Sequence, residues 1–196
     1  MTNTTSQISV DPTHCPSPHS SANKLGRLVW QCVSLIFFRP SPWFLHGGRR
    51  FLLRLFGARI GRGAQIMPSA KIWAPWNLTM GDHATISHGV DLYNVAAITI
   101  GKHATVSQRA FLCTATHDID HPHMPLQTAP IEIADGAWIC AEAFVHPGVT
   151  VGVDAVVAAR AVVLRAVGPR QVVAGNPARH LRDRRVGPDA QEPAAS

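Results

Sequence analysis

A cluster of histidines lies in the middle of the chain, in the segment 114–126. His117, His121 and His123 share this segment with two aspartates. Imidazole titrates near neutral pH, so a histidine here can take the proton from a hydroxyl group as that hydroxyl attacks a carbonyl carbon. Three histidines in one loop could instead bind a metal ion, because neutral imidazole is a zinc ligand. The segment therefore predicts either a general base or a metal site.

The residues that must position this segment follow a period of six. From Ile60 onward an aliphatic residue recurs, and four positions after it there is usually a small residue. A period of six fits neither a helix nor a plainly alternating strand, and it indicates a solenoid. The aliphatic positions are Ile60, Ile66, Ile72, Met80, Ile86, Leu92, Ile100, Val106, Leu112, Ile133, Ile139, Val145, Val151, Val157 and Val163.

These hexads group in threes, because a small residue directly follows the first aliphatic residue of each triplet. Three hexads make one coil of about 18 residues, which describes a triangular prism with the aliphatic side chains inside. Five coils are predicted, and the spacings between their first residues are 20, 20, 33 and 18. The spacing of 33 leaves a long loop after the third coil, between about residues 116 and 131. Insertions into such repeats often form the binding face, and His117 lies where this one begins.

The two ends of the chain lack the hexad pattern. Residues 1–23, rich in Thr, Ser, Pro and His, predict a disordered leader and not a signal peptide, and residues 183–196 predict a disordered tail. Residues 24–57 predict a helical cap, because the end of a solenoid must be covered, and residues 58–182 form the β-helix domain. The apolar run in the cap is too short to cross a bilayer. Basic and apolar residues over 28–56 nevertheless allow peripheral contact with an anionic membrane surface.

Composition narrows the classes of partner. A chain of 196 residues fits a single domain. The net charge of +6 and the pI near 9.8 favour a phosphorylated ligand. A basic stripe with interleaved aromatic residues is absent, which argues against nucleic acid as a partner. Four cysteines without C-x-x-C pairing and without a secretory start favour the cytoplasm.

The repeat resembles the left-handed parallel β-helix of the hexapeptide-repeat transferases, over about 110 residues of coil and the segment 173–179. The left hand is taken from the resemblance, because most parallel crossovers are right-handed. Within these transferases the chain looks closest to the colanic acid biosynthesis acetyltransferase group and its nodulation and galactoside relatives. The segments that carry this likeness are 55–61, 75–78, 91–94, 112–114 and 129–131.

The resemblance implies an acetyl-CoA-dependent O-acetyltransferase that acts on a sugar hydroxyl of an exopolysaccharide or surface-glycan precursor. It implies a homotrimer, with His117 as the catalytic base and no metal. Ser87 stands where galactoside-type members have an acceptor-binding asparagine, so the acceptor is expected to differ from theirs. The residues that the resemblance assigns to acetyl-CoA are Trp138, Ala141, Ala159, Arg165, Arg179 and Arg182. The candidates for hydrogen bonding to the acceptor sugar are Asp91, Tyr93 and Asn94.

Two alternative functions remain. A β-helix without catalytic activity could act as a scaffold in a polysaccharide-synthesis complex, with the apolar N-terminal run as its attachment. The γ-class carbonic anhydrases share the fold and bind zinc through three histidines, two of them within the coils. Here His83, His88 and His103 lie on the second and third coils, and none forms that pair with His117. The metal site is therefore the less favoured alternative.

Overall fold

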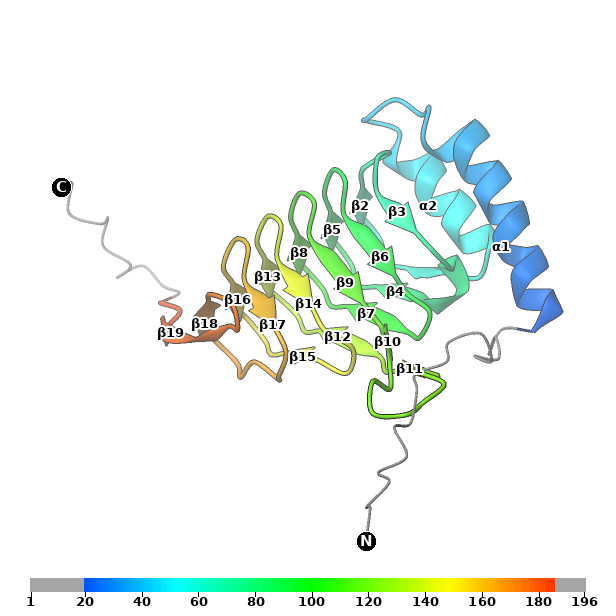
Figure 1. The fold of residues 1–196 in the computed structure, drawn as a ribbon. Helices are drawn as coiled ribbons and strands as arrows, with labels where there is room; N and C mark the ends of the chain where they lie inside the picture. Colours follow the sequence, from blue (N-terminus) through cyan, green and yellow to red (C-terminus); the bar gives the residue numbers. More distant parts are fainter. Residues whose placement is uncertain (1–19, 186–196) are drawn as a thin grey trace, which may run out of the picture.

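A computed structural model describes residues 20–185 of the chain. Over this range the chain winds into a triangular prism of stacked coils, with two helices at its N-terminal end (Figure 1). Three parallel sheets, named A, B and C here, form the sides of the prism, and each complete coil gives one short strand to each sheet. The predicted all-β solenoid is confirmed.

The order of strands within each sheet follows the order of the coils. Sheet A contains β1 (Arg59–Ile60), β4 (Leu78–Met80), β7 (Ile98–Ile100), β12 (Ile131–Ile133) and β15 (Thr150–Val151). Sheet B contains β2 (Gln65–Ile66), β5 (Thr85–Ile86), β8 (Thr105–Val106), β13 (Trp138–Ile139), β16 (Val156–Val157), β18 (Gln171–Ala174) and the antiparallel β19 (Arg179–Asp183). Sheet C contains β3 (Lys71–Ile72), β6 (Asp91–Tyr93), β9 (Phe111–Cys113), β14 (Phe144–Val145) and β17 (Val162–Val163). A 3-10 turn, η3 (Pro75–Asn77), precedes β4.

The register of sheet A reproduces the predicted spacings. Ile60 pairs with Met80, Met80 with Ile100, Ile100 with Ile133, and Ile133 with Val151. A sixth, incomplete coil follows the five that were predicted. In it Val167 bridges to Val151, and β18 pairs with β16. The hexad pattern missed this coil because Val167 follows Val163 by only four residues.

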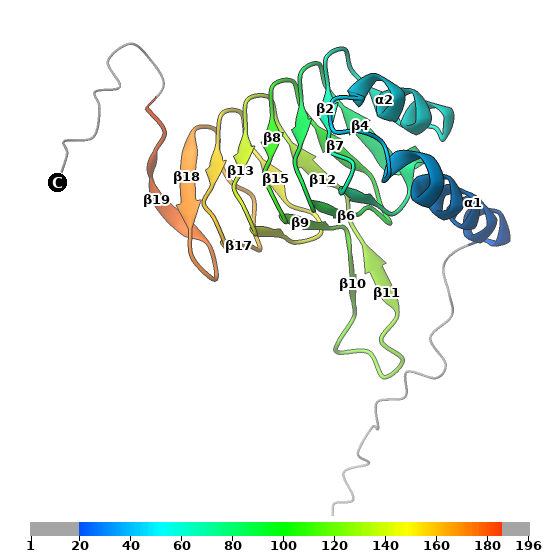
Figure 2. The same cartoon turned by 90° about the horizontal axis from the view of Figure 1, so that it is seen from above.

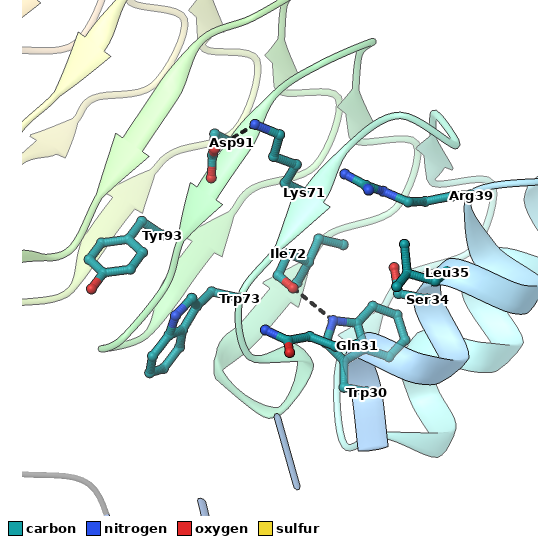
Figure 3. Close-up of a pocket in the computed structure, with 10 residues that line it drawn as sticks. All are labelled: Trp30, Gln31, Ser34, Leu35, Arg39, Lys71, Ile72, Trp73, Asp91 and Tyr93. Atoms are coloured by element: carbon teal, nitrogen blue, oxygen red, sulfur yellow. Dashed lines mark hydrogen bonds and ion pairs between the residues drawn. The ribbon is translucent and has the colours of Figure 1, made fainter. Parts of the chain in front are cut away.

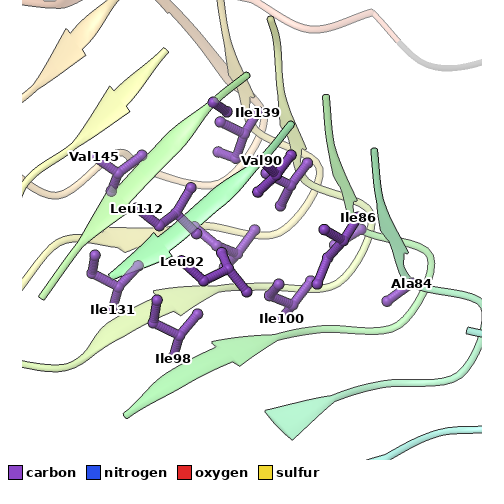
Figure 4. Close-up of a cluster of buried hydrophobic side chains, with 14 of the residues drawn as sticks. Ala84, Ile86, Val90, Leu92, Ile98, Ile100, Leu112, Ile131, Ile139 and Val145 are labelled. Atoms are coloured by element: carbon purple, nitrogen blue, oxygen red, sulfur yellow. The ribbon is translucent and has the colours of Figure 1, made fainter. Parts of the chain in front are cut away.

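The aliphatic residues of the repeat fill the interior of the prism (Figure 4). In sheet C the stacked side chains of Leu92, Leu112 and Val145 are completely buried. The alanines four positions after the aliphatic residues are buried as well, for example Ala84 and Ala104. Burial of one large aliphatic side chain contributes about 1.5–3 kcal/mol, so the hexad pattern is the main source of stability.

Truncation of one of these side chains is therefore expected to weaken the prism strongly. Leu112 pairs with Leu92 on one side and with Val145 on the other, so neither neighbour can move far to fill a gap. Leu112→Ala should lower the free energy of unfolding by about 2–5 kcal/mol. Denaturant unfolding at fixed protein concentration measures this loss. Glu132→Ala, an exposed change on sheet A, is the control and should stay within about 0.5 kcal/mol.

Two helical segments cover the N-terminal end of the prism. The first is α1 (Ser21–Val33), which continues as the π-helix η2 (Ser34–Phe38), and the second is α2 (His46–Leu55). Ser20 caps α1, because its Oγ accepts a hydrogen bond from the backbone N–H of Asn23 at 3.2 Å. The helix thus begins inside the segment 1–23 that was predicted to be a disordered leader. Residues 1–19 lie outside the described range.

The start of the segment 183–196, which was predicted to be a disordered tail, is part of the folded structure. β19 ends at Asp183, and the side chain of Arg184 donates hydrogen bonds to two backbone carbonyls of the prism. Ordered structure therefore enters the segment 183–196, because backbone pairing and a guanidinium hold it to sheet B. Residues 186–196 lie outside the described range.

The helices supply hydrogen-bond donors to all three sides of the first coil. This coil has no preceding coil to pair with, so its strand carbonyls need other donors. The bonds run from Arg54 Nε to Ile60 O at 3.1 Å, from Arg49 Nε to Ile66 O at 2.6 Å, and from Trp30 Nε1 to Ile72 O at 2.7 Å. The predicted helical cap is confirmed. Neither it nor any other helix within residues 20–185 combines the length and apolar character needed to cross a membrane.

Candidate active site

The long loop after the third coil forms a β-hairpin that projects from one edge of the prism (Figure 2). Its strands β10 (Ala115–His117) and β11 (Leu126–Thr128) pair antiparallel, with His117 opposite Leu126. The hairpin leaves sheet C after β9 and returns to sheet A at β12, so it stands on the edge between these sheets, the C–A edge. His117 therefore lies on a strand whose base is fixed by the prism.

The imidazole of His117 is exposed and held by one backbone contact. Its Nδ1 lies 2.6 Å from the carbonyl oxygen of Met124 on the other side of the hairpin. A carbonyl oxygen can only accept a hydrogen bond, so Nδ1 carries the proton and Nε2 of the neutral ring keeps its lone pair. This tautomer is the one that a general base needs.

The acidic neighbours of His117 brace the hairpin. Asp118 accepts hydrogen bonds from the backbone N–H of Asp120 and from Nε2 of Gln127, both at 3.1 Å. At the tip, Nδ1 of His121 accepts from the backbone N–H of His123 at 3.1 Å. Throughout residues 20–185 the His, Cys, Asp and Glu side chains form no group of three or more that could hold a metal ion. These contacts give the metal-site alternative no support.

Trp138 lies on sheet B and not beside the hairpin. Its indole Nε1 donates to Ser107 Oγ at 2.8 Å, and the side chain is 44 % exposed. Arg184 lines the same cavity of about 430 Å³, and its guanidinium donates to Gly136 O and Asp154 O, each at 3.1 Å. Arg184 could not be predicted from the repeat, because it follows the last hexad and has no periodic signal.

Ala141 and Ala159 occupy equivalent positions of successive coils, on the edge between sheets B and C. The register that pairs Ile139 with Val157 places them one strand spacing apart. Beside them Glu142 binds Arg160 and Arg109, and these hydrogen bonds, that of Arg160 first, lower the pKa of the Glu142 carboxyl group. The small side chains of Ala141 and Ala159 leave room for a pantetheine arm beside these charged residues. That the arm of coenzyme A runs along this edge stays a prediction.

Two of the three predicted phosphate-binding arginines come together at the C-terminal end. Arg165 and Arg179 line a cavity of about 590 Å³. Arg165 follows β17 on the C–A edge, two coils beyond the hairpin, which is about 10 Å along the prism. Arg182 lies on β19, outside this cavity, with its Nη1 bonded to Asp183 O at 3.0 Å.

Asp91 and Tyr93 line a cavity of about 440 Å³ between α1, η2 and sheet C, called the cap pocket here (Figure 3). The Tyr93 ring packs edge-on against Trp73, with centroids 5.6 Å apart, and Lys71 Nζ lies 3.4 Å from Asp91 Oδ2. The carbonyl of Tyr93 accepts hydrogen bonds from Thr114, which precedes β10, so this pocket adjoins the base of the hairpin. The other lining residues are Trp30, Gln31, Ser34, Leu35, Arg39 and Ile72.

Asn94 does not line the cap pocket, and its predicted role in acceptor binding gains no support from its position. The side chain is completely buried. Its Oδ1 accepts from Ala74 N at 3.0 Å, and its Nδ2 donates to Ala74 O at 2.6 Å. Both ends of the amide group are thus used to join the first two coils at the C–A edge.

Known proteins resemble this chain over most of its length. WcaF of Escherichia coli (strain K12), named as a colanic acid biosynthesis acetyltransferase, is 41 % identical over 169 residues, which are 86 % of this chain and 93 % of WcaF. The galactoside O-acetyltransferase of the same organism is 25 % identical over 138 residues, covering 69 % of this chain and 68 % of the relative. No protein family model matches the chain.

A solved structure extends the likeness to three dimensions. The hexapeptide-repeat containing acetyltransferase of Vibrio cholerae O1 biovar eltor, crystallised in complex with acetyl coenzyme A, superposes with a TM-score of 0.77 at 28 % identity. The match covers 87 % of this chain and 93 % of that one. Fold and sequence together define a left-handed parallel β-helix enzyme of the transferase class. The chain belongs to the hexapeptide-repeat acetyltransferase family, as its sequence predicted.

Proposed function

We propose that the protein transfers an acetyl group from acetyl-CoA to a sugar hydroxyl of an exopolysaccharide or surface-glycan precursor in the cytoplasm. The observation that carries the proposal is the hydrogen bond between His117 Nδ1 and the Met124 carbonyl, which leaves Nε2 able to accept a proton. As Nε2 takes the hydroxyl proton, the sugar oxygen attacks the thioester carbonyl carbon. The C–S bond then breaks, and the imidazolium gives its proton to the departing sulfur. A backbone N–H stabilises the oxyanion between these steps.

The donor side of the proposal uses the residues on sheet B and at the C-terminal end. Trp138, Ala141 and Ala159 border the pantetheine arm, and Arg165, Arg179 and Arg182 bind the phosphates of coenzyme A. Guanidinium groups suit this task because they form paired hydrogen bonds to phosphate oxygens. The acetyl coenzyme A bound by the Vibrio cholerae relative supports acetyl-CoA as the donor.

We further propose that three copies form a ring. Within one chain the hairpin stands on the C–A edge, whereas Trp138 lies on sheet B, the opposite side of the triangle. A ring brings unlike surfaces of neighbouring copies together, and threefold symmetry closes it. The hairpin of one copy would then face sheet B of the next, so that His117 and Trp138 share a site between protomers.

We assign the acceptor sugar to the cap pocket. Trp73 and Tyr93 present aromatic rings to the C–H groups of a sugar, and Asp91 accepts hydrogen bonds from hydroxyl groups. Lys71 is paired with Asp91, so Arg39 is the cation of this pocket that would suit a sugar carrying an acidic or phosphate group.

Tyr93→Ala is expected to separate acceptor binding from donor binding. Loss of the aromatic ring should raise the KM for the acceptor about tenfold and leave the KM for acetyl-CoA within about twofold, because Tyr93 lies away from the donor residues. Tyr93→Phe keeps the ring and should retain acceptor binding. Steady-state kinetics with each substrate varied in turn measures both constants. An equal rise in both would place Tyr93 outside the acceptor site.

The proposed function is tested by release of coenzyme A thiol from acetyl-CoA in the presence of free sugars, nucleotide sugars and lipid-linked oligosaccharides. At least one class should accelerate thiol release and become acetylated on oxygen. If no acceptor accelerates thiol release, the scaffold alternative is favoured. The mass of the protein in solution tests the trimer independently of activity.

A further inference from the structure

The outer surface of the helical cap is unusually apolar. Of the sixteen large hydrophobic side chains that are exposed within residues 20–185, eleven lie between residues 25 and 55. We call this surface the cap face. Its members are Leu25, Leu28, Val29, Leu35, Ile36, Phe37, Trp43, Phe44, Leu45, Phe51 and Leu55.

The helices of the cap have apolar residues on two sides. One side packs against the prism, and the cap face is the other. In α2, Leu53 is buried against the prism, whereas Phe51 and Leu55, one turn apart, are 65 % and 68 % exposed. In the first helical segment, Trp30 and Phe38 are buried, while other apolar residues recur at helical spacing on the outside. Both helices lie at the end of the prism in both views (Figures 1 and 2), and the exposed fractions of the cap-face side chains mean that the prism leaves them largely uncovered.

Charge is distributed unevenly around this face. Nine of the eighteen Lys and Arg residues, and none of the twelve Asp and Glu residues, lie between residues 12 and 81. Lys24 and Arg39 are exposed among the apolar residues of the first helical segment, and Arg54 is exposed on α2. Residues 20–81 contain no carboxylate, and within residues 20–185 Lys24, Arg39 and Arg54 form no ion pair, so the cap face combines apolar surface with positive charge.

We propose that the cap face docks on a bilayer that contains anionic lipids. Helices with apolar and basic surface lie in the membrane interface, with the apolar side chains in the acyl boundary and the cations at the anionic headgroups. Trp43 and Phe44, at the turn between the helices, are aromatic residues of the kind that settle at this boundary. A second copy of the chain fits the face poorly, because cations would meet cations.

Docking by this face would bring the acceptor pocket to the membrane. Leu35 belongs to the cap face and also lines the cap pocket, as does the neighbouring Arg39 (Figure 3). This step rests on the proposed function: the acceptor class becomes a glycan carried on a membrane lipid. In a threefold ring the three cap faces lie at the same level along the axis, so they would contact one bilayer together and strengthen binding.

Vesicle flotation of the full chain tests the docking. The protein should float with vesicles of phosphatidylcholine plus phosphatidylglycerol, float less at high salt, and stay behind with phosphatidylcholine alone. The double variant Phe37→Ser/Phe44→Ser should lower partitioning onto the anionic vesicles about tenfold or more. The matched control Val153→Ser/Leu164→Ser changes two exposed apolar residues outside the cap and should keep it.

The docking would be overturned by no flotation of the native protein with anionic vesicles, or by equal flotation of the cap variant and the control. A fall in the solution mass of the cap variant would assign the face to a second copy instead and would also overturn it. Circular dichroism checks that the variants are folded. Acetyl transfer to a soluble acceptor should be unchanged in the cap variant. Vesicle binding without any acetyl transfer would reject the proposed function alone, and transfer without vesicle binding would reject the docking alone.

Discussion

His117→Ala is expected to lower kcat for acetyl transfer by about 10² to 10⁴-fold, because the variant loses the proposed proton acceptor, Nε2 of His117. The KM for acetyl-CoA should change little, since the residues proposed to hold the donor lie on sheet B and at the C-terminal end. Thiol release measured against acetyl-CoA concentration, at a saturating concentration of acceptor, gives both constants.

The structure offers a close control for this variant. His121 lies on the same exposed hairpin but makes its contact at the tip, so His121→Ala should keep near-native activity. His117 is exposed and makes one hydrogen bond, so neither variant should shift the free energy of unfolding by more than about 1 kcal/mol. Near-native kcat in His117→Ala would falsify the assignment of the base, and a large loss in His121→Ala would mean that hairpin geometry, not a proton acceptor, had been tested.

The fold could be predicted from the sequence because a solenoid repeats one short-range rule. Each coil needs three inward aliphatic residues at fixed spacing. The pairing of Leu92 with Leu112 therefore follows from the spacing alone, without information on the rest of the chain. The same rule located the long insertion, since a spacing of 33 in a pattern of about 18 marks where the chain leaves the prism, but it did not predict that the insertion forms a hairpin. His117 was identified through that interruption.

The hexad spacing does not predict the contacts that residues make outside the repeat. The cap pocket arises because η2 brings Arg39 against sheet C, and nothing in the hexad spacing fixes how the helices dock. Asn94 follows two residues that do line the pocket, but its side chain turns inward to satisfy the backbone of Ala74. A polar residue at a corner can serve either purpose, and the sequence pattern does not distinguish them.

The sequence pattern did not indicate that Arg49 joins the prism to the turn between the helices. It is completely buried, although arginine rarely is. Its guanidinium donates to the carbonyls of Ile66, Pro42 and Trp43 and to Ser41 Oγ. Burial lowers the pKa of this group, but it stays charged at neutral pH. One side chain thus joins the first coil to the turn between the helices.

Arg49→Met is therefore expected to lower the free energy of unfolding by about 3–5 kcal/mol, because the buried carbonyl of Ile66 and the partly buried carbonyls of Pro42 and Trp43 lose their donor while the volume is roughly kept. Arg50→Met is the matched control. Arg50 lies next in the same helix, is half-buried and donates to one carbonyl, that of Ala64, so its loss should be about 1 kcal/mol.

Denaturant unfolding at fixed protein concentration measures both arginine variants. Arg49→Lys should recover only part of the loss, since an ammonium group cannot reach acceptors that a planar guanidinium spans. Equal losses for Arg49→Met and Arg50→Met would mean that water replaces the buried donors. Because the turn held by Arg49 carries Trp43 and Phe44, Arg49→Met should also weaken flotation with anionic vesicles, whereas Arg50→Met should weaken it much less.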